Sequence, residues 1–506
     1  MKRTVFVILA VLLSTAFGRV WYVHPDSTQN SIQPCLNTCG AGDTVLVAAG
    51  TYRENIDWPN TQGIELLSES GPDATVIYGD SSRAVVNVHV AVDTMTVLEG
   101  FTIRGGCASA ARPRGGGISI VDGGPMVRNN IITGNYGKWG GGLGAVYAES
   151  VYVVGNRFMG NAGQWGGAML IDSSTAFIKW NRIARNWTDP AAIVYVERLR
   201  GLIEGNTFSG NHASQYCGLG CLYETDAPVR NNVFEDETAD VYSAGVYFSG
   251  GPTSEFSGNV IRRCRAPMYA GIMCAWANPT IINDTFVDNT TGTSARGIVS
   301  FFNGSSASVR GCYFSGNTQE AFAGAVMVED SSLAWVDSCR FVNNGTAGVY
   351  FCYDAGGTVH NCDISDNFMY GVYCENVDDS IDVRYNWWGD STGPFHPDSN
   401  PGGLGDTVSL GVRFRPWLTN PVYGLAEEEM LPAARSARAV PFQTLVNGAI
   451  SLPPRLTAVL LDISGRRVMT LQSGPNDVRH LVPGVYFARR ATGEGRVANS
   501  KVIVTR

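Results

Sequence analysis

The chain has 506 residues and a mass of 54.3 kDa, too long for one ordinary globular core but suited to a large domain with a smaller one. Charged residues make up only 16% against 44% apolar ones, with 60 glycines, which excludes a globally disordered chain. The net charge of -8 and the four lysines exclude a phosphate-tracking surface, so we expect no nucleic-acid partner.

The first eighteen residues have the parts of a secretory signal peptide. The basic Met1-Lys2-Arg3 precedes the apolar run from Val5 to Leu13, and small residues follow around Gly18. Nine apolar residues are too few to span a bilayer. The sequence therefore predicts a signal peptide at 1–18 and an exported chain without a transmembrane segment, either secreted or held at the outer-membrane surface.

A repeat of about 25 residues occupies the middle of the chain. Its first polar position recurs at steps of 23 to 28 residues: Asn130, Asn156, Asn181, Asn206, Asn232, Asn259, Asp284, Cys312, Cys339, Cys362 and Asn386. A large apolar residue stands two positions after each of these. Five positions after the register residue, eight of the eleven repeats carry asparagine: Asn135, Asn161, Asn186, Asn211, Asn289, Asn317, Asn344 and Asn367.

The repeat predicts an all-β right-handed parallel β-helix, in which three short strands complete each turn. A leucine-rich horseshoe has a similar period, but the segments between the markers are β-branched and aromatic and show no helical period. We expect about 12 or more turns within residues 19–420, with both ends capped. Asparagine suits the corners because it tolerates left-handed backbone and its amide can bond to the amide one turn away.

The last part of the chain has a different pattern. Residues 421–440 are rich in Glu, Ala, Arg and Pro without apolar periodicity, which is typical of a flexible linker. Residues 441–506 alternate short strands with glycine turns and predict a small β-sandwich. An ordinary accessory module, with no special role in export, is one interpretation of this sandwich.

Two resemblances add to this interpretation. The run from Gly42 to Tyr52, the repeats, and the closing Asn386-Trp387-Trp388-Gly389 resemble the pectin-lyase-like right-handed β-helix proteins of bacterial envelopes. The Asp-Ile-Ser-Gly-Arg string at 462–466 and the Pro-Gly-Val-Tyr-Phe string at 483–487 resemble the C-terminal sorting domain of type IX secretion substrates. That second resemblance implies the type IX machinery as a partner of residues 441–506. The β-helix resemblance indicates a fold rather than an activity.

Five aromatic residues recur just before small-residue corners. They stand nine or ten residues after their register positions and are Trp139, Trp165, Tyr216, Tyr242 and Tyr269. Rings repeated at the spacing of the turns form a platform on which successive sugars could stack. A structural ladder of rings that stiffens the corner is the competing interpretation.

A carboxylate pair is the second candidate site. Asp172 and Glu197 both stand sixteen residues after their register positions, which predicts that they lie on one face of adjacent turns. Like charges so placed require a raised pKa, a bound cation such as Ca²⁺, or a slip in register. With Lys179, the pair would suit a polysaccharide lyase or glycosidase. The alternation of Lys179, Glu204 and Arg230 also fits a surface ion-pair ladder.

Cysteine and histidine patterns carry no catalytic signal. Cys312, Cys339 and Cys362 occupy the register position on consecutive turns, which allows either disulfides or stacked buried thiols. The six histidines show no metal-ligand spacing, and no calcium-binding motif is present, so the sequence predicts no cofactor.

The sequence as a whole favours an exported β-helix that binds polysaccharide or another extended ligand along one face. Two alternatives stay open: an enzyme, either a polysaccharide lyase or a glycoside hydrolase, and a purely structural stalk or adhesin.

Overall fold

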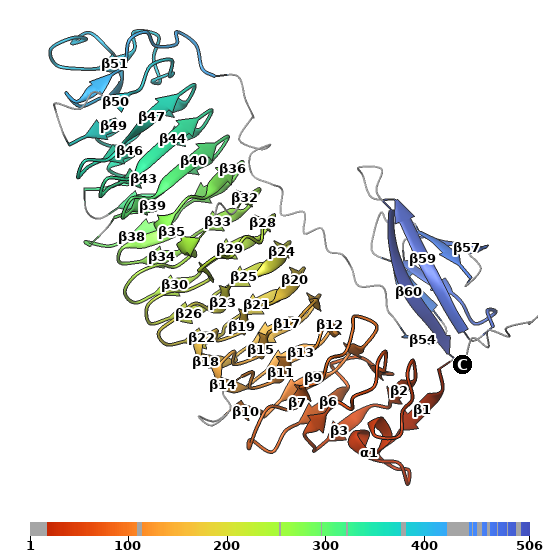
Figure 1. Ribbon diagram of the computed structural model, residues 1–506. Helices are drawn as coiled ribbons and strands as arrows, with labels where there is room; N and C mark the ends of the chain where they lie inside the picture. The colour runs from red at the N-terminus through yellow and green to blue at the C-terminus, as the bar shows by residue number, and fades with distance from the viewer. Residues whose placement is uncertain are drawn as a thin grey trace, which may run out of the picture.

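The computed structural model describes residues 18–108, 114–251, 255–294, 296–319, 322–375 and 381–422, together with most of the strands between 445 and 505. Residues 1–17 of the predicted signal peptide and all but the first two residues of the predicted linker lie outside this part of the chain. The described strands stack into a long coil, coloured from red to cyan in Figure 1.

One turn of the coil contains up to four strands. In a representative turn, β12 (Met126–Arg128), β13 (Ile131–Thr133), β14 (Tyr136–Trp139) and β15 (Leu143–Val146) follow one another around the axis. The next turn begins with β16 (Val151–Val154), which pairs in parallel with β12. Each strand thus bonds to its equivalents one turn before and one turn after, which is the arrangement that the repeat predicts.

The stacked strands form four parallel sheets, numbered here in the order in which a turn meets them. Sheet 1 has sixteen strands, from β1 (Val20–Val23) to β53 (Val412–Arg413), and sheet 2 has thirteen, from β3 (Gly50–Tyr52) to β48 (Asp363–Ser365). Sheet 3 has nine short strands, from β10 (Cys107–Ala108) to β42 (Thr318–Gln319). Sheet 4 has thirteen, from β4 (Ile56–Asp57) to β49 (Tyr370–Cys374).

The predicted parallel β-helix of twelve or more turns is confirmed, and sheet 3 is the addition that the sequence did not indicate. Seven of its nine strands, such as β22 (Trp187–Thr188), have only two residues. Two residues are too few for an alternating apolar pattern, so the sequence pattern predicts a corner where this fourth side of the coil lies.

The large apolar residue of each repeat lies at the centre of the coil. In sheet 2, Phe208 is in register with Phe234, and their rings stack with centroids 4.4 Å apart. Farther along, Phe314 stacks on both Phe286 and Phe341. All eleven members of this column are fully buried. Burial of such side chains is the main favourable term in the stability of the coil.

Two ladders of asparagine amides run along the inside of the coil, one at each end of the sheet 2 strands. In the first, Nδ2 of Asn181 donates to Oδ1 of Asn206 at 2.9 Å, and Asn206 donates to Asn232 at 2.9 Å. In the second ladder, Asn161 and Asn186 are bonded in the same way at 3.1 Å. The predicted contact between amides of adjacent turns is therefore present.

The expected left-handed backbone occurs one residue earlier than the sequence suggested. Positive φ values are found at the residues just before the ladder positions, such as Asn129, Gly155, Trp180 and Gly205, and at none of the described ladder asparagines. A ladder asparagine is selected by its amide, which satisfies the backbone groups of the corner. The preceding residue makes the bend.

Three cysteines continue the first ladder where asparagine is missing. The backbone N–H of Cys312 donates to Sγ of Cys339 at 3.4 Å, and that of Cys339 donates to Sγ of Cys362 at 3.3 Å. All twelve cysteines are free, and all but Cys107 are buried. Of the two possibilities that the sequence allowed, the structure therefore has stacked thiols.

Both ends of the coil are covered. The short helix α1 (Ile32–Leu36), which has no period long enough to detect in the sequence, buries Ile32 and Leu36 against the first turns. At the other end Trp388 is fully buried, and Trp417 packs against the same core. Such caps protect the edge strands of the terminal turns.

The described C-terminal strands form two small sheets. The order in the larger sheet is β54 (Leu445–Asn447), β60 (Val497–Thr505), β59 (Gly484–Ala491), β56 (Ala458–Leu461) and β57 (Arg467–Leu471). The second sheet pairs β55 (Ala449–Leu452) with β58 (Gly474–Asp477). Their apolar side chains make a separate cluster that includes Ile450, Leu460 and Leu471.

Candidate functional site

The aromatic residues that the sequence singles out border the outer face of sheet 4. Trp139 ends β14 and Trp165 ends β18 (Ala162–Trp165), and the two residues are in register. Their rings stack with centroids 5.7 Å apart and an angle of 14° between the planes. Both side chains are half-buried, so each ring keeps an edge or a face for solvent.

The three tyrosines do not continue this column in a straight line. Tyr216, Ser243 and Tyr269 are the residues in register on successive turns, so Tyr242 stands one position away. Its ring nevertheless stacks on Tyr216 with centroids 5.1 Å apart. Tyr269 is buried and stacks on Phe302. The structure thus brings the five residues into three groups rather than one row, because the lengths of the turns differ by one or two residues.

Further rings on sheet 4 extend the aromatic surface. Tyr195 of β23 (Val194–Glu197) packs edge-on against Trp165, with centroids 5.4 Å apart. Tyr247 of β31 (Val246–Gly251) stacks on Tyr216 at 4.7 Å. Burial raises the pKa of Tyr195 well above its usual value and that of Tyr216 to about 12, so both hydroxyls are protonated donors at neutral pH.

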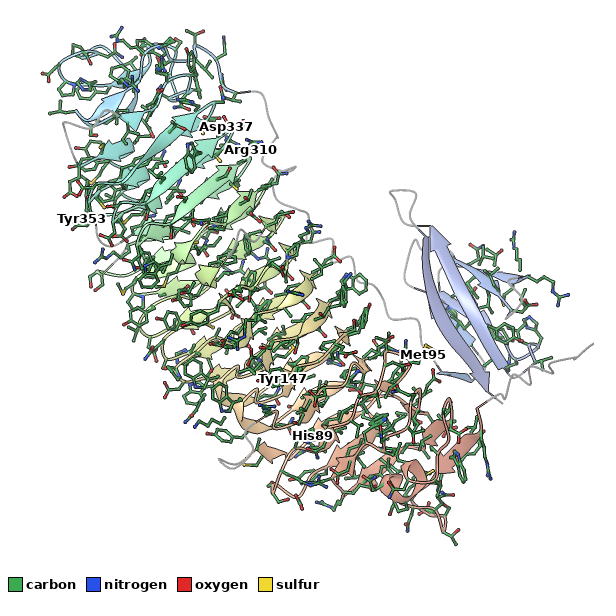
Figure 2. All side chains as sticks on the ribbon, viewed as in Figure 1. His89, Met95, Tyr147, Arg310, Asp337 and Tyr353 are labelled. Atoms are coloured by element: carbon green, nitrogen blue, oxygen red, sulfur yellow. The ribbon has the colours of Figure 1, made fainter. Side chains whose placement is uncertain are left out.

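A second set of rings, which the sequence reasoning missed, follows the sheet 4 strands on the opposite border of the same face. Tyr147, Tyr223, Trp276 and Tyr353 are each between 54% and 63% exposed. Figure 2 labels Tyr147 and Tyr353. All four have positive φ, which is uncommon for bulky residues and costs conformational energy. The first three stand seventeen residues after a register position, a signal that was available in the sequence.

The predicted carboxylate pair is present on this face. Asp172 of β19 (Met169–Asp172) is in register with Glu197. The guanidinium of Arg198 bridges them, with Nη2 2.6 Å from Oδ1 of Asp172 and Nη1 bonded to Glu197. Tyr195 also donates its hydroxyl hydrogen to Glu197 at 3.2 Å. Of the ways in which two stacked carboxylates can be stabilised, the structure therefore shows a neighbouring cation, and that cation is the Arg198 side chain.

Lys179 is not brought to this pair. It ends β20 (Thr175–Lys179) in sheet 1, where it is in register with Glu204 and lies 3.2 Å from its carboxylate. Arg230 follows Glu204 in the same column and binds Glu255 at 2.6 Å. The alternation of signs therefore corresponds to two surface ion pairs on neighbouring turns, on a different sheet from Asp172 and Glu197.

A third carboxylate on the same face was not predicted from the sequence. Glu329 directly follows β43 (Gly324–Val328), is 1% exposed and is paired with Arg296. Its Oε1 is buried and has no hydrogen-bond partner among the described residues, and burial raises the pKa of this carboxyl. It stands seventeen residues after Cys312 rather than sixteen, so a search at the fixed offset of Asp172 passes over it.

Neither a metal cluster nor a membrane helix is found in the described part of the chain. No group of three or more His, Cys, Asp or Glu side chains there has a geometry that could hold a metal ion. Within the same residues, no helix has the length and apolar character needed to cross a bilayer.

Solved structures of similar fold include carbohydrate-active proteins. The catalytic unit of a GH87 alpha-1,3-glucanase from Streptomyces thermodiastaticus strain HF3-3 is 13% identical, with a TM-score of 0.32 over 76% of this chain and 65% of that one. This chain thus spans less than two thirds of the glucanase. A mannuronic acid specific polysaccharide family 6 lyase from human gut microbiota is 10% identical, with a TM-score of 0.34 over 80% and 92% of the two chains.

A tailspike protein from Acinetobacter baumannii bacteriophage Fri1, a capsular polysaccharide depolymerase, is 12% identical, with a TM-score of 0.19 over 96% and 82% of the two chains. At such low identities and TM-scores, none of these similarities carries information about substrate or activity. No protein in a search of curated sequences matches this chain.

The sequence match agrees with the geometry of the coil. The family described as "Right handed beta helix region" matches residues 62–234, 166–323 and 239–388, which together cover more than half of the chain. The protein therefore belongs to the family of right-handed β-helix proteins.

Proposed function

We propose that the protein binds a polysaccharide, or another extended ligand, along the outer face of sheet 4. The observation that carries this proposal is the pair of aromatic borders on that face. One border contains Trp139, Trp165, Tyr216, Tyr242 and Tyr269, and the other contains Tyr147, Tyr223, Trp276 and Tyr353. Both borders run along the axis of the coil, which is the direction in which a glycan chain would extend.

Ring spacing and local chemistry support this choice of ligand. Successive turns lie about 4.8 Å apart, so rings on neighbouring turns present flat apolar surfaces at short, regular intervals. Between the borders, the hydroxyl of Tyr195 and the carboxylates of Asp172 and Glu197 offer hydrogen bonds. A surface that combines flat rings with a few polar groups is the type that binds sugars.

The proposal extends to where the protein works. A signal peptide at residues 1–18 would export the chain, and residues 441–506 would act as a sorting domain for type IX secretion. The support for both lies in the sequence motifs alone. The protein would then act as a secreted or outer-membrane surface protein that holds a glycan of the cell's surroundings.

A binding screen tests the proposal. The purified full chain is titrated with uronate-rich and neutral polysaccharides, and the Trp139→Ala plus Trp165→Ala variant is compared with the unchanged protein. Loss of two stacking rings is expected to weaken binding by at least about tenfold. The matched control is Trp180→Ala plus Trp335→Ala, which removes two exposed tryptophans from the sheet 1 side. Unchanged affinity in the first variant would refute the aromatic platform.

Catalysis is a second candidate, which the closeness of Asp172 and Glu197 favours. Two carboxylates on adjacent turns are the groups that a glycosidase needs. Against this, both are held by Arg198, and Lys179 lies on another sheet. If the protein releases new reducing or unsaturated ends from a polysaccharide, and the Glu197→Gln variant does not, the catalytic function replaces the binding function.

A further inference from the structure

The last turns of the coil lose their fourth strand. Sheet 3 ends at β42, and neither of the next two turns has a strand there. In those turns only three positions separate the second-ladder asparagine from the sheet 4 strand, from Asn344 to Ala347 and from Asn367 to Tyr370. Earlier turns with an asparagine at this position use seven or eight, as from Asn161 to Met169. The shorter turns cut across the corner and leave a step in the outer surface.

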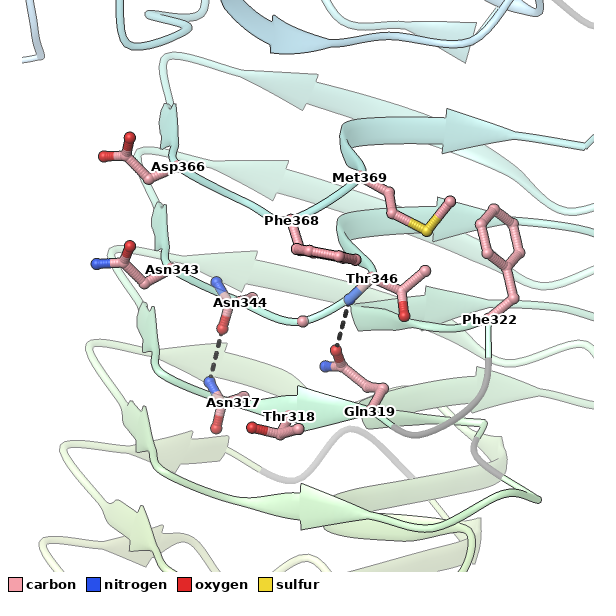
Figure 3. Close-up of a pocket in the computed structure, with 11 residues that line it drawn as sticks. Asn317, Thr318, Gln319, Phe322, Asn343, Asn344, Thr346, Asp366, Phe368 and Met369 are labelled. Carbon is pink, nitrogen blue, oxygen red and sulfur yellow. Dashed lines mark hydrogen bonds between the residues drawn. The ribbon is translucent and has the colours of Figure 1, made fainter.

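A hollow of about 670 Å³ lies at this step. Figure 3 shows Gln319 and Thr318 of β42 on one side of it and Phe368, Met369 and Phe322 on the other. Phe368 is 84% exposed, which is unusual for a phenylalanine, whereas Phe322 is fixed by edge-on contacts with three tyrosines of sheet 4. We name this hollow, with its lining residues, the notch.

Among the described residues of the notch, one buried polar group has no hydrogen-bond partner. Gln319 is only 7% exposed, and its Oε1 accepts the backbone N–H of Thr346 at 3.0 Å. Because an N–H can bond only to the oxygen of the amide, the orientation of the side chain is fixed. Its Nε2 is therefore the group left buried with no hydrogen bond to the part of the chain that the structure describes. An unsatisfied buried donor is costly, so the site favours a ligand that brings an acceptor.

We propose that the notch binds a neutral hexopyranose unit of a glycan. The Phe368 ring would stack on the apolar face of the sugar, and Nε2 of Gln319 would donate to a sugar hydroxyl. Thr318, Asn343 and Asp366 offer further hydrogen bonds at the rim. The volume lies within the usual range for small-ligand sites, about 300 to 1,000 Å³. This inference takes its class of ligand, a glycan, from the proposed function. It adds a second binding site, separate from the face of sheet 4, and it specifies that the sugar is uncharged.

The charge of the lining residues selects a neutral sugar. Among the described residues that line the notch, Asp366 is the one charged residue, and no lysine or arginine is among them. A uronate would place its carboxylate in a site with one negative charge and no cation to offset it, which is unfavourable. A purely apolar ligand would leave the Gln319 donor unsatisfied.

Titration of the full chain with short neutral gluco-, manno- and galacto-oligosaccharides tests the proposal, with oligouronates of the same lengths beside them. At least one neutral oligosaccharide is expected to bind at least about tenfold more tightly than any oligouronate. Phe368→Ala is expected to weaken that binding by about tenfold or more. Gln319→Glu keeps the oxygen that accepts from Thr346 but loses the donor, and we expect a similar loss.

Controls separate the notch from the fold and from the face of sheet 4. Phe368 is exposed, so its variant should unfold at the same temperature as the unchanged protein, and Trp335→Ala should leave oligosaccharide binding unchanged. Unchanged binding in Phe368→Ala, or equal affinity for oligouronates, would overturn the notch proposal. The proposed function fails separately, if Trp139→Ala plus Trp165→Ala leaves polysaccharide binding unchanged.

Discussion

The inside of the coil and its outer face follow different rules. Inside, most turns contribute an equivalent asparagine and all contribute an equivalent large apolar residue, because each must bond to or pack against the same group one turn away. On the outer face of sheet 4, tryptophan, tyrosine and carboxylate positions change from turn to turn. The inner residues are thus required by the fold, whereas the outer ones are free to be selected by a ligand.

Removal of one ladder amide is the strongest way to test this contrast. Asn206 accepts from Asn181 and donates to Asn232 and to the carbonyl oxygen of Ile178. Asn206→Ala leaves these buried groups without partners, so we expect the free energy of unfolding to fall by about 4 kcal/mol. Chemical denaturation measures it. The exposed Asn60→Ala is the matched control, with an expected change of about 0.5 kcal/mol or less.

The contrast between the inside of the coil and its outer face can be tested further at Glu237, where a carboxyl group replaces a ladder amide. Glu237 is fully buried and accepts from Asn211 at 2.9 Å and from the thiol of Cys217 at 3.2 Å. Burial raises its pKa from the ordinary 4.5 to about 7. Between these values the folded protein holds more protons than the unfolded chain, so stability falls as the pH rises through this window and is level above it.

Glu237→Gln is expected to remove this dependence, because the amide resembles the protonated acid. When the pH is raised from 4 to 8, the free energy of unfolding of the variant should increase by about 3 kcal/mol relative to that of the unchanged protein. Denaturation curves at both pH values measure this difference. If the difference between the two proteins is the same at both, the buried carboxyl does not titrate as described.

On the outer face, the expected effects on stability are small. Arg198→Gln breaks the bridge between Asp172 and Glu197, but its side chain is 43% exposed, so the pair of charges is screened by water. We expect a loss of about 1 kcal/mol or less, which shrinks in about 0.5 M salt. Arg185→Gln is an exposed control. A loss as large as that of Asn206→Ala would remove the distinction between the two regions.

The sequence predicts the inside of the coil well because each turn repeats the same requirement. The register of Asn181 and Asn206, the buried Phe208 column and the adjacency of Asp172 and Glu197 all follow from counting residues. The short turns after Cys339 and Cys362 were also countable, at 23 and 24 residues. Their consequence, the notch around Gln319, depends on which side of the turn is shortened, and step length alone does not carry that information.

The borders of the outer face were harder to predict. Tyr242 falls out of register with Tyr216 because one extra residue in a turn shifts the corner without disturbing the core. Nearness in sequence suggests that Lys179 lies beside Asp172 and Glu197, but seven residues carry the chain around a corner to another sheet. Tyr147 and Tyr223 stand at the same offset from their register positions. The residues next to each ring in the sequence, however, do not indicate that it belongs to an aromatic border.

Hydroxyl-radical footprinting with a bound polysaccharide tests most directly whether one face of the coil holds the ligand. The rings of Trp139, Trp165, Tyr147 and Tyr223 are expected to be protected, while Trp335 on sheet 1 reacts at the same rate with and without ligand. Protection of Trp335, or none on the borders of sheet 4 when the polysaccharide is bound, would contradict this account.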